Sequence, residues 1–190
     1  QKKFTNSGQN LDLDQVENVF HSLAEKYPQQ RPRILLAMAK IFMTAQAFDR
    51  AEPLLLEILS TNALFAKAWT MMARLKSWQG EWSEALLAVD KALEISPNNS
   101  QYHVLKGSIY LNVQDFFAAQ KAFMTALNID RKNDQIKQDI WNIYLDLDMV
   151  HEVQRDFGSY IFSALTCVTL NNMAVAYRRQ GELALALEVY

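Results

Sequence analysis

The sequence contains very little cysteine, glycine, proline or histidine. Its 190 residues include 1 Cys, 5 Gly, 4 Pro and 3 His. The single cysteine, Cys167, cannot form an internal disulfide, and it stands in an apolar run where cysteine usually acts as a small core residue. A reducing compartment is compatible with this composition, and we expect the chain to be cytoplasmic. No apolar run approaches the roughly 20 residues of a membrane-spanning helix, and we recognise no signal peptide.

Catalytic and metal-binding motifs are missing as well. His21, His103 and His151 are far apart, and none is spaced with a Cys or a carboxylate as metal ligands are. Neither the glycine-rich phosphate-binding motifs nor the nucleophile-elbow motif occurs. The pair Asp146 and Asp148 is more typical of a solvated helix end than of an acid and a base in catalysis. We therefore predict no catalytic residue, no metal ligand and no cofactor, and we expect a protein that is not an enzyme.

The sequence does contain an internal repeat. Four series of positions recur at steps of 33 or 34 residues. They are Phe48, Trp82, Phe116, Val150 and Leu183; Ala51, Ala85, Ala119, Val153 and Ala186; Phe42, Lys76, Tyr110, Tyr144 and Tyr177; and Gln46, Gly80, Gln114, Asp148 and Gly181. A period of this size indicates stacked helical hairpins, which usually present a long surface that holds something else.

Residues 67–97 show one repeat unit most clearly. Apolar residues recur at helical spacing from Trp69 to Leu75, and Gly80 interrupts this pattern with a residue suited to a left-handed helix end. A second amphipathic stretch follows and stops at Pro97, because proline cannot continue a helix. The unit is therefore predicted to be a helix–turn–helix hairpin.

This unit resembles the tetratricopeptide repeat, whose pattern is W-x2-L-G-x2-Y followed by A, F, A and P. It departs from the pattern at Lys76, where the family has Tyr. The matching residues here are Trp69, Met72, Ala73, Ala85, Val89, Ala92 and Pro97, and those of the other units are Leu35, Met38, Ala39, Phe42, Ala51 and Leu55; Gly107, Tyr110, Ala119, Phe123 and Ala126; and Leu170, Met173, Ala174, Tyr177, Gly181, Ala186 and Tyr190. The resemblance implies an all-α fold, a right-handed superhelix (α-solenoid) of antiparallel helix–turn–helix repeats.

The repeat also predicts how the chain is divided. Residues 12–27 form one amphipathic pattern, which Asp12 or Asp14 is expected to cap and Pro28 to end. The predicted parts are a flexible segment at 1–10, a helix that acts as a half-repeat or cap at 11–30, and an array at 32–190 with units 32–65, 66–99, 100–133, a degenerate 134–166 and a truncated 167–190. Because the chain begins with Gln1 and stops inside a unit, we expect it to be a piece of a longer protein.

The unit at 134–166 departs from the scheme. Trp141 stands where the other units have a small residue, and Val153 stands where they have Ala. A tryptophan at a close helix crossing pushes the helices apart, so this hairpin is predicted to be splayed or shifted. Either the unit has degenerated without functional meaning, or a local bend here shapes a binding surface.

The charges differ between the two helices of each unit. The stretches 33–44, 67–79 and 101–113 contain Lys or Arg and no acid, whereas the second helices hold many acids. In the family the first helices line the concave surface, so the resemblance implies a basic and apolar groove that attracts an acidic, apolar ligand. The predicted partner-binding residues are Arg33, Leu36, Lys40, Met43, Lys67, Thr70, Arg74, Trp78, Val104, Ser108 and Leu111.

We therefore expect a protein–protein interaction scaffold that binds a partner peptide or helix in this groove. Trp78 is either an anchor for the partner or part of the packing between repeats. The clamp with which some family members hold acidic chaperone tails is not recognisable, because Leu36 with Lys40, or Thr70 with Arg74, occupies its place.

Two other functions remain open. One is a regulatory arm of a bacterial response regulator, since residues 96–99 and 171–181 loosely resemble arrays fused to receiver domains. The other is an RNA-binding helical-repeat module, which the nearly neutral net charge of −2 makes less favourable. Self-association is expected if nothing follows the last unit, through its apolar residues Leu183, Leu185, Leu187 and Val189.

Overall fold

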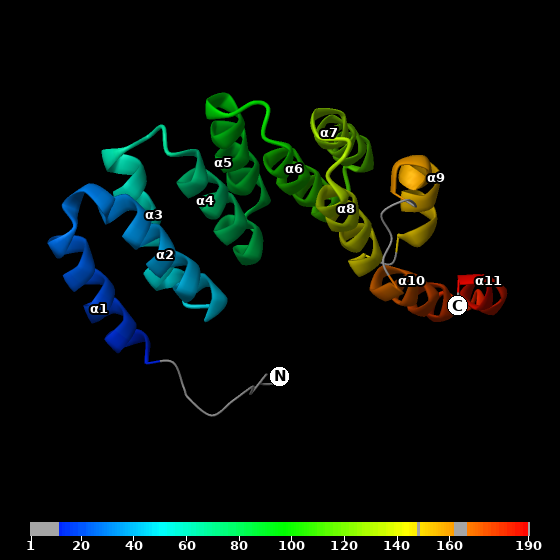
Figure 1. Cartoon of the computed structure of the whole chain (residues 1–190), viewed down its shortest axis with the longest axis horizontal. Coiled ribbons are helices and arrows are strands. Elements are labelled where there is room, and N and C mark those ends of the chain that lie inside the picture. The colour runs from blue at the N-terminus through cyan, green and yellow to red at the C-terminus, as the bar shows by residue number, and fades with distance from the viewer. Residues whose placement is uncertain (1–11, 148, 162–166, 190) are drawn as a thin grey trace.

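The chain folds into helices that follow one another as antiparallel pairs. The computed structural model describes residues 12–147, 149–161 and 167–189. Its elements are α1 (Leu13–Lys26), a short 3-10 turn (Pro28–Gln30), α2 (Arg31–Thr44), α3 (Phe48–Thr61), α4 (Ala66–Gln79), α5 (Trp82–Ile95), α6 (Ser100–Asn112), α7 (Phe116–Ile129), α8 (Asp134–Asp146), α9 (Val150–Ile161), α10 (Cys167–Arg179) and α11 (Leu183–Val189). Figure 1 shows these helices side by side along an arch, with α4, α6 and α8 towards its inner side and α5, α7 and α9 towards its outer side.

Several sequence predictions fall outside the part of the chain that the structure describes. They concern residues 1–10, Asp148 and Tyr190, together with the side chains of Asp146, Cys167 and Val189.

The turn inside each hairpin explains two of the repeating series. Gln46, Gly80, Gln114 and Gly181 all have positive φ angles, of 61°, 80°, 62° and 84°. A left-handed residue at this point lets the chain leave one helix and enter the next. The backbone N–H of the residue after this position donates to a backbone carbonyl oxygen of the preceding helix, at a residue of the series Phe42, Lys76, Tyr110, Tyr144 and Tyr177. The donor–acceptor pairs are Ala47–Phe42, Glu81–Lys76, Asp115–Tyr110, Met149–Tyr144 and Glu182–Tyr177, all with N···O distances between 2.9 and 3.0 Å. The period therefore records one turn repeated along the chain.

The helix starts follow from local residues. The series Phe48, Trp82, Phe116, Val150 and Leu183 supplies the first residue of every second helix in a pair. Asp12 caps α1, as expected, by accepting from the amides of Asp14 and Gln15. Asn99 and Asn133 cap α6 and α8 in the same way. The capping asparagines are a signal in the sequence that the repeat analysis did not use.

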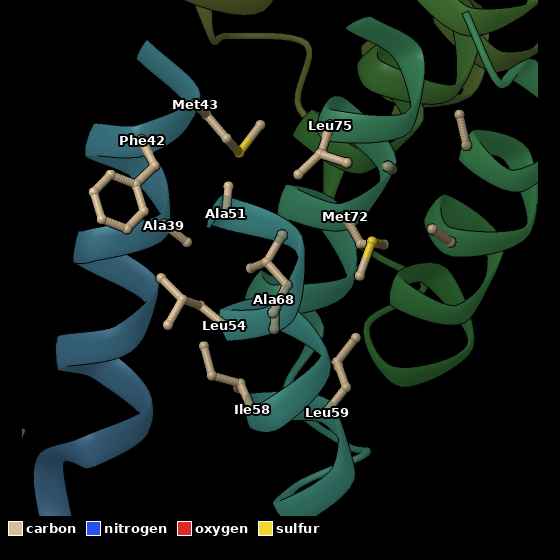
Figure 2. Close-up of a cluster of buried hydrophobic side chains, with 14 of the residues drawn as sticks. Ala39, Phe42, Met43, Ala51, Leu54, Ile58, Leu59, Ala68, Met72 and Leu75 are labelled. Carbon is tan, nitrogen blue, oxygen red and sulfur yellow. The ribbon is translucent and has the colours of Figure 1, made fainter. Parts of the chain in front are cut away.

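Small residues allow the two helices of a pair to cross closely. Ala39 and Ala51 are fully buried between α2 and α3, with Phe42, Leu54 and Ile58 around them (Figure 2). The residues that face each other at the crossing vary in size from pair to pair. By the repeat these are Ala39 with Leu55, Ala73 with Val89, Gly107 with Phe123, and Trp141 with Phe157, all buried.

Gly107 is the smallest of these residues because its partner is large. A Cβ atom at Gly107 would lie 2.5 Å from the Phe123 ring, closer than two carbon atoms can approach. The Phe123 ring therefore occupies the volume that the side chains of Ala39 and Ala73 fill in the first two pairs. A small residue on one helix and a large one on the other fill one crossing.

The fourth pair cannot use this solution, because Trp141 and Phe157 are both large. Both side chains are fully buried. Within the described residues, fewer positions of α8 and α9 lie close to each other than in the other pairs, and more positions of α8 lie close to α6 than of α6 to α4. Phe157 instead packs in an aromatic cluster with Phe123 and Tyr144, at centroid distances of 6.1 and 5.7 Å. This arrangement agrees with the prediction of a splayed or shifted hairpin.

Candidate functional site

A pocket opens on the inner side of the arch, where α4, α6 and α8 meet. It has a volume of about 400 Å³. Its lining residues are Arg74 from α4, Gln101, Val104, Leu105 and Ser108 from α6, and Asp139, Asn142 and Ile143 from α8. We call this the inner pocket. It lies where α8 comes close to α6, so the irregular fourth pair supplies one of its walls.

The polar groups of the inner pocket are partly held by one another. Asp139 accepts a hydrogen bond from the Gln135 side-chain amide at 2.8 Å and a longer one from that of Gln101 at 3.4 Å. The Ser108 hydroxyl donates to the Leu105 carbonyl at 2.8 Å. Arg74 is exposed and has no carboxylate within ion-pairing distance among the residues that the structure describes. The pocket thus offers a guanidinium, a carboxylate and an apolar floor.

Several basic side chains elsewhere on the arch form ion pairs with carboxylates. Lys106 lies 2.7 Å from Asp90, Lys91 lies 2.8 Å from Glu94, and Arg31 lies 2.7 Å from Glu57. In contrast, Arg33, Lys40 and Lys67 are exposed, and no ion pair is found for them in the described parts of the chain. By the repeat, Lys40 corresponds to Arg74, and Arg33 and Lys67 correspond to Gln101. These residues therefore continue the register of the pocket along α2 and α4.

Lys76, the departure from the family pattern, lies among three carboxylates. Its Nζ is 2.8 Å from Glu52, 2.7 Å from Glu81 and 3.2 Å from Glu84, which joins α3, α4 and α5. The hydrogen bond to Glu52 is the main reason why the pKa of Lys76 is raised above its ordinary value. The expectation of basic first helices and acidic second helices therefore needs a correction, because Lys76 and Lys106 are neutralised by acids of the second helices. Asp139 also adds an acid to the inner pocket.

A second hollow, of about 510 Å³, lies at the end of α2 and α4. It is lined by Met43, Thr44, Gln46, Phe48 and Trp78. The Trp78 ring packs on Phe48 with a centroid distance of 5.8 Å, yet the side chain remains 57% exposed. Trp78 thus takes part in packing between repeats and still offers an indole face to solvent. Met43, expected in the groove, is only 2% exposed and belongs to the hydrophobic core, so it is not accessible to a partner.

The structure distributes the remaining predicted residues over different environments. Leu36 and Thr70 are half-buried. Val104 and Ser108 line the inner pocket beside Arg74. Leu111, expected in the groove, is only 2% exposed and belongs to the hydrophobic core, because its face of α6 turns towards α7 and α8. It is not accessible to a partner.

Sequence reasoning did not place Asp139, Asn142 and Ile143 in the site. The signal was present, since Asp139 and Asn142 stand one repeat after Leu105 and Ser108. The register was not continued into the fourth unit, because that unit breaks the family pattern at Trp141. The repeat also does not indicate that α8 packs against α6.

In the described part of the chain, no group of three His, Cys, Asp or Glu side chains is arranged to bind a metal ion. None of the helices described there has the length and apolar character needed to cross a bilayer.

Comparisons with known proteins agree with the fold. Family models described as tetratricopeptide repeats match residues 42–109 and 100–133. A curated relative, anaphase-promoting complex subunit 3 of Schizosaccharomyces pombe, is 22% identical over 192 residues, which are 95% of this chain and 27% of that protein. The chain thus spans about a quarter of the length of that relative.

Solved structures show the same architecture. A tetratricopeptide repeat protein from Parabacteroides merdae superimposes with a TM-score of 0.71 at 19% identity, over 94% of this chain and 71% of that one. A chain of the APC/C hetero-tetramer Cut9–Hcn1 gives a TM-score of 0.69 at 12% identity, over 94% of this chain and 35% of that one. The expected all-α, right-handed solenoid of helical hairpins is confirmed. With its repeating hairpin turn, its small crossing residues and these matches, the chain belongs to the tetratricopeptide repeat family.

Proposed function

We propose that this chain is a non-catalytic scaffold that holds a segment of another protein along the inner side of the arch. In this proposal, residues 32–190 act as one array and residues 11–30 cap its first end. Arg74 and Lys40 pair with carboxylates of the bound segment, and the half-buried Ile143 contacts its apolar side chains. The observation behind the proposal is that, among the residues that the structure describes, these inner cations have no carboxylate partner, whereas Lys76, Lys91 and Lys106 do.

The inner pocket also limits which segment fits. Asp139 and Asn142 line the same pocket as Arg74, so a segment with acids along its whole length would place one of them next to the Asp139 carboxylate. A segment with a carboxylate near Arg74 and a backbone or side-chain N–H near Asp139 satisfies both ends. We therefore expect a partner that alternates acidic and apolar residues.

The relatives suggest the setting in which such a scaffold works. Both the curated relative and one of the solved structures are subunits of the anaphase-promoting complex. We propose that this chain likewise contributes a surface for a neighbouring subunit in a larger assembly. Hypotheses of an RNA-binding module or a response-regulator arm remain predictions, as does pairing through α11, whose Leu183 and Leu187 are 62% and 75% exposed.

A selection of binding peptides from a random display library tests the inner surface. The best peptide is labelled and its Kd is measured by fluorescence anisotropy against the wild type and Lys40→Glu/Arg74→Glu. We expect peptides with acidic and apolar residues and a weakening of at least about tenfold in the variant, because two attractive charge pairs become repulsive.

Lys121→Glu/Lys132→Glu is the matched control, since it changes the net charge equally at two exposed residues away from the inner pocket. Equal affinity of the wild type and Lys40→Glu/Arg74→Glu would remove the proposal. Tight binding of single-stranded RNA that falls steeply with salt would favour the RNA hypothesis instead.

A further inference from the structure

The outer side of the arch has a groove that is larger and more apolar than the inner pocket. It lies between α3 and α5, with α4 as its floor, and has a volume of about 720 Å³. We call it the outer groove. Its lining residues are Glu52, Leu56, Leu59 and Ser60 of α3, Trp69, Met72 and Lys76 of α4, and Glu84, Leu87, Ala88 and Lys91 of α5.

Two leucines on the rim of the outer groove are exposed without contributing to the core. Leu56 is 54% exposed and Leu87 is 67% exposed. On the floor, the Trp69 indole N–H donates to the Ala63 carbonyl at 2.8 Å, so the polar atom of that side chain is already satisfied. What the groove offers to a ligand is therefore mostly apolar surface, whose burial is favourable at about 25 cal/mol per Å².

The next repeat provides an internal comparison, because it has the same backbone. At the positions of Leu56, Met72 and Leu87 it has Asp90, Lys106 and Lys121. The solenoid therefore forms with charged residues at these positions, and its stability does not require leucine there. The next groove, at α6 and α7, is lined in part by Tyr110, Phe117 and Lys121 and is smaller, at about 370 Å³. The apolar surface is therefore most extensive in the groove between α3 and α5, which indicates a site there rather than a uniform property of the outer side.

The charge of the outer groove is uneven along its length. At one end, three carboxylates (Glu52, Glu81 and Glu84) surround the single ammonium of Lys76. At the other end, Lys91 is paired with Glu94. The first end therefore has an excess of negative charge, which attracts a basic side chain, while the second is balanced.

We propose that the outer groove binds a short amphipathic helix of a partner protein, with two apolar residues between Leu56 and Leu87 and a Lys or Arg near Glu52 and Glu84. Along α3 the lining runs from Glu52 to Ser60, which is about 12 Å at about 1.5 Å per residue. About two turns of a partner helix fit this length and contact the groove through residues three or four apart. The site is separate from the inner pocket, so the scaffold can hold two segments at once.

Labelled amphipathic helical peptides test this inference. Each contains two leucines three or four residues apart and a lysine one turn before or after them; a second set has glutamate in place of lysine, and a third has scrambled sequences. Anisotropy measures their Kd for the wild type and for Leu56→Asp/Leu87→Lys, which introduces the residues of the next repeat. We expect the lysine peptides to bind best and the variant to lose at least about tenfold in affinity, because charged side chains replace the two leucines that contact the apolar residues of the peptide. A tenfold change in Kd corresponds to about 1.4 kcal/mol.

Two control variants separate the outer groove from other surfaces. Phe117→Ser removes a side chain that is 79% exposed on α7 and installs the residue of the preceding repeat, so binding should not change. Arg74→Glu should also leave binding unchanged, which distinguishes this site from the inner pocket. Glu52→Gln/Glu84→Gln should reduce the preference for lysine over glutamate peptides. Circular dichroism checks that each variant retains its helicity.

Three results would overturn the inference. One is that no lysine peptide binds better than its scrambled control. Another is that Leu56→Asp/Leu87→Lys binds as tightly as the wild type. The third is a wild-type dimer in sedimentation that dissociates in that variant, since the groove would then be covered by a second copy of this chain.

Discussion

The pair α6 and α7 and the pair α8 and α9 follow each other in the chain but fill their crossings differently. In the first, Gly107 leaves room for the Phe123 ring, and the two helices pack closely. In the second, Trp141 and Phe157 are both large and both buried, and the helices stand further apart. The close crossing thus depends on the combined volume of two side chains rather than on either residue alone.

This difference has a consequence on the inner side of the arch. Since α8 packs less against α9, it lies closer to α6, and its residues Asp139, Asn142 and Ile143 form a wall of the inner pocket. The sequence left two interpretations of the fourth unit open, degeneration without meaning or a bend that shapes a surface. The position of the pocket favours the second as a hypothesis for binding.

The largest expected effect is that of removing Trp141. We expect Trp141→Ala to lower the free energy of unfolding by about 3–5 kcal/mol, because it leaves a cavity at a fully buried site. Urea unfolding followed by circular dichroism measures this loss. Trp78→Ala is the control, since that side chain is 57% exposed and its truncation should cost far less. Equal losses in the two variants would show that Trp141 does not fill the fourth crossing.

A smaller effect is expected at Gly107. Gly107→Ala places a methyl group against the Phe123 ring, and overpacking of this kind costs about 1–3 kcal/mol, partly offset by the better helix propensity of alanine. Adding Phe123→Leu should recover most of the loss, because leucine is what the first pair has at this position. Thermal unfolding of the two single variants and the double variant measures this coupling. If the stability losses of Gly107→Ala and Phe123→Leu simply add in the double variant, residues 107 and 123 do not compete for the same volume at the crossing.

The smallest of these effects concerns Lys76, where the third and fourth units have Tyr110 and Tyr144. Lys76→Met leaves the three carboxylates without their shared cation, and we expect the free energy of unfolding to fall by about 1 kcal/mol at neutral pH, because Glu81 and Glu84 are 43% and 61% exposed and stay solvated. The free energy of unfolding, measured by urea denaturation, should fall less in Lys76→Met/Glu52→Gln than the sum of the losses in Lys76→Met and Glu52→Gln. If the two losses simply add, the ion cluster contributes no coupling energy.

The alkaline pH dependence gives a second readout for Lys76. Its pKa is raised in the folded chain above the ordinary value of 10.5, so its stabilisation is complete below about pH 10 and is lost as the pH rises further. Burial raises the pKa of Tyr144 too, which also favours the folded state only while the phenol is protonated. The wild type should therefore lose stability above pH 10, and Lys76→Met should lose less of it. Identical alkaline profiles would count against the ion cluster.

Much of the fold could be predicted because its signals are local. The first residue of each second helix, the left-handed turn and the small crossing residues recur at fixed steps, so Trp82, Gly80 and Ala85 could be assigned from their neighbours. The residues that form the inner pocket were harder to predict. Arg74, Val104 and Ser108 follow from the register, whereas the wall from α8 depends on where that helix lies in space.

The succession of helical hairpins follows from the periodic sequence alone, because every unit must bury the same face and make the same turn. Which charges meet, and how closely the helices pack, depends on the folded arrangement. Lys76 reaches Glu52 and Glu84 on two other helices, and Trp141 and Phe157 exceed the volume of one crossing. These outcomes depend on side chains that lie far apart in the chain and are brought together by packing, which a periodic pattern does not encode.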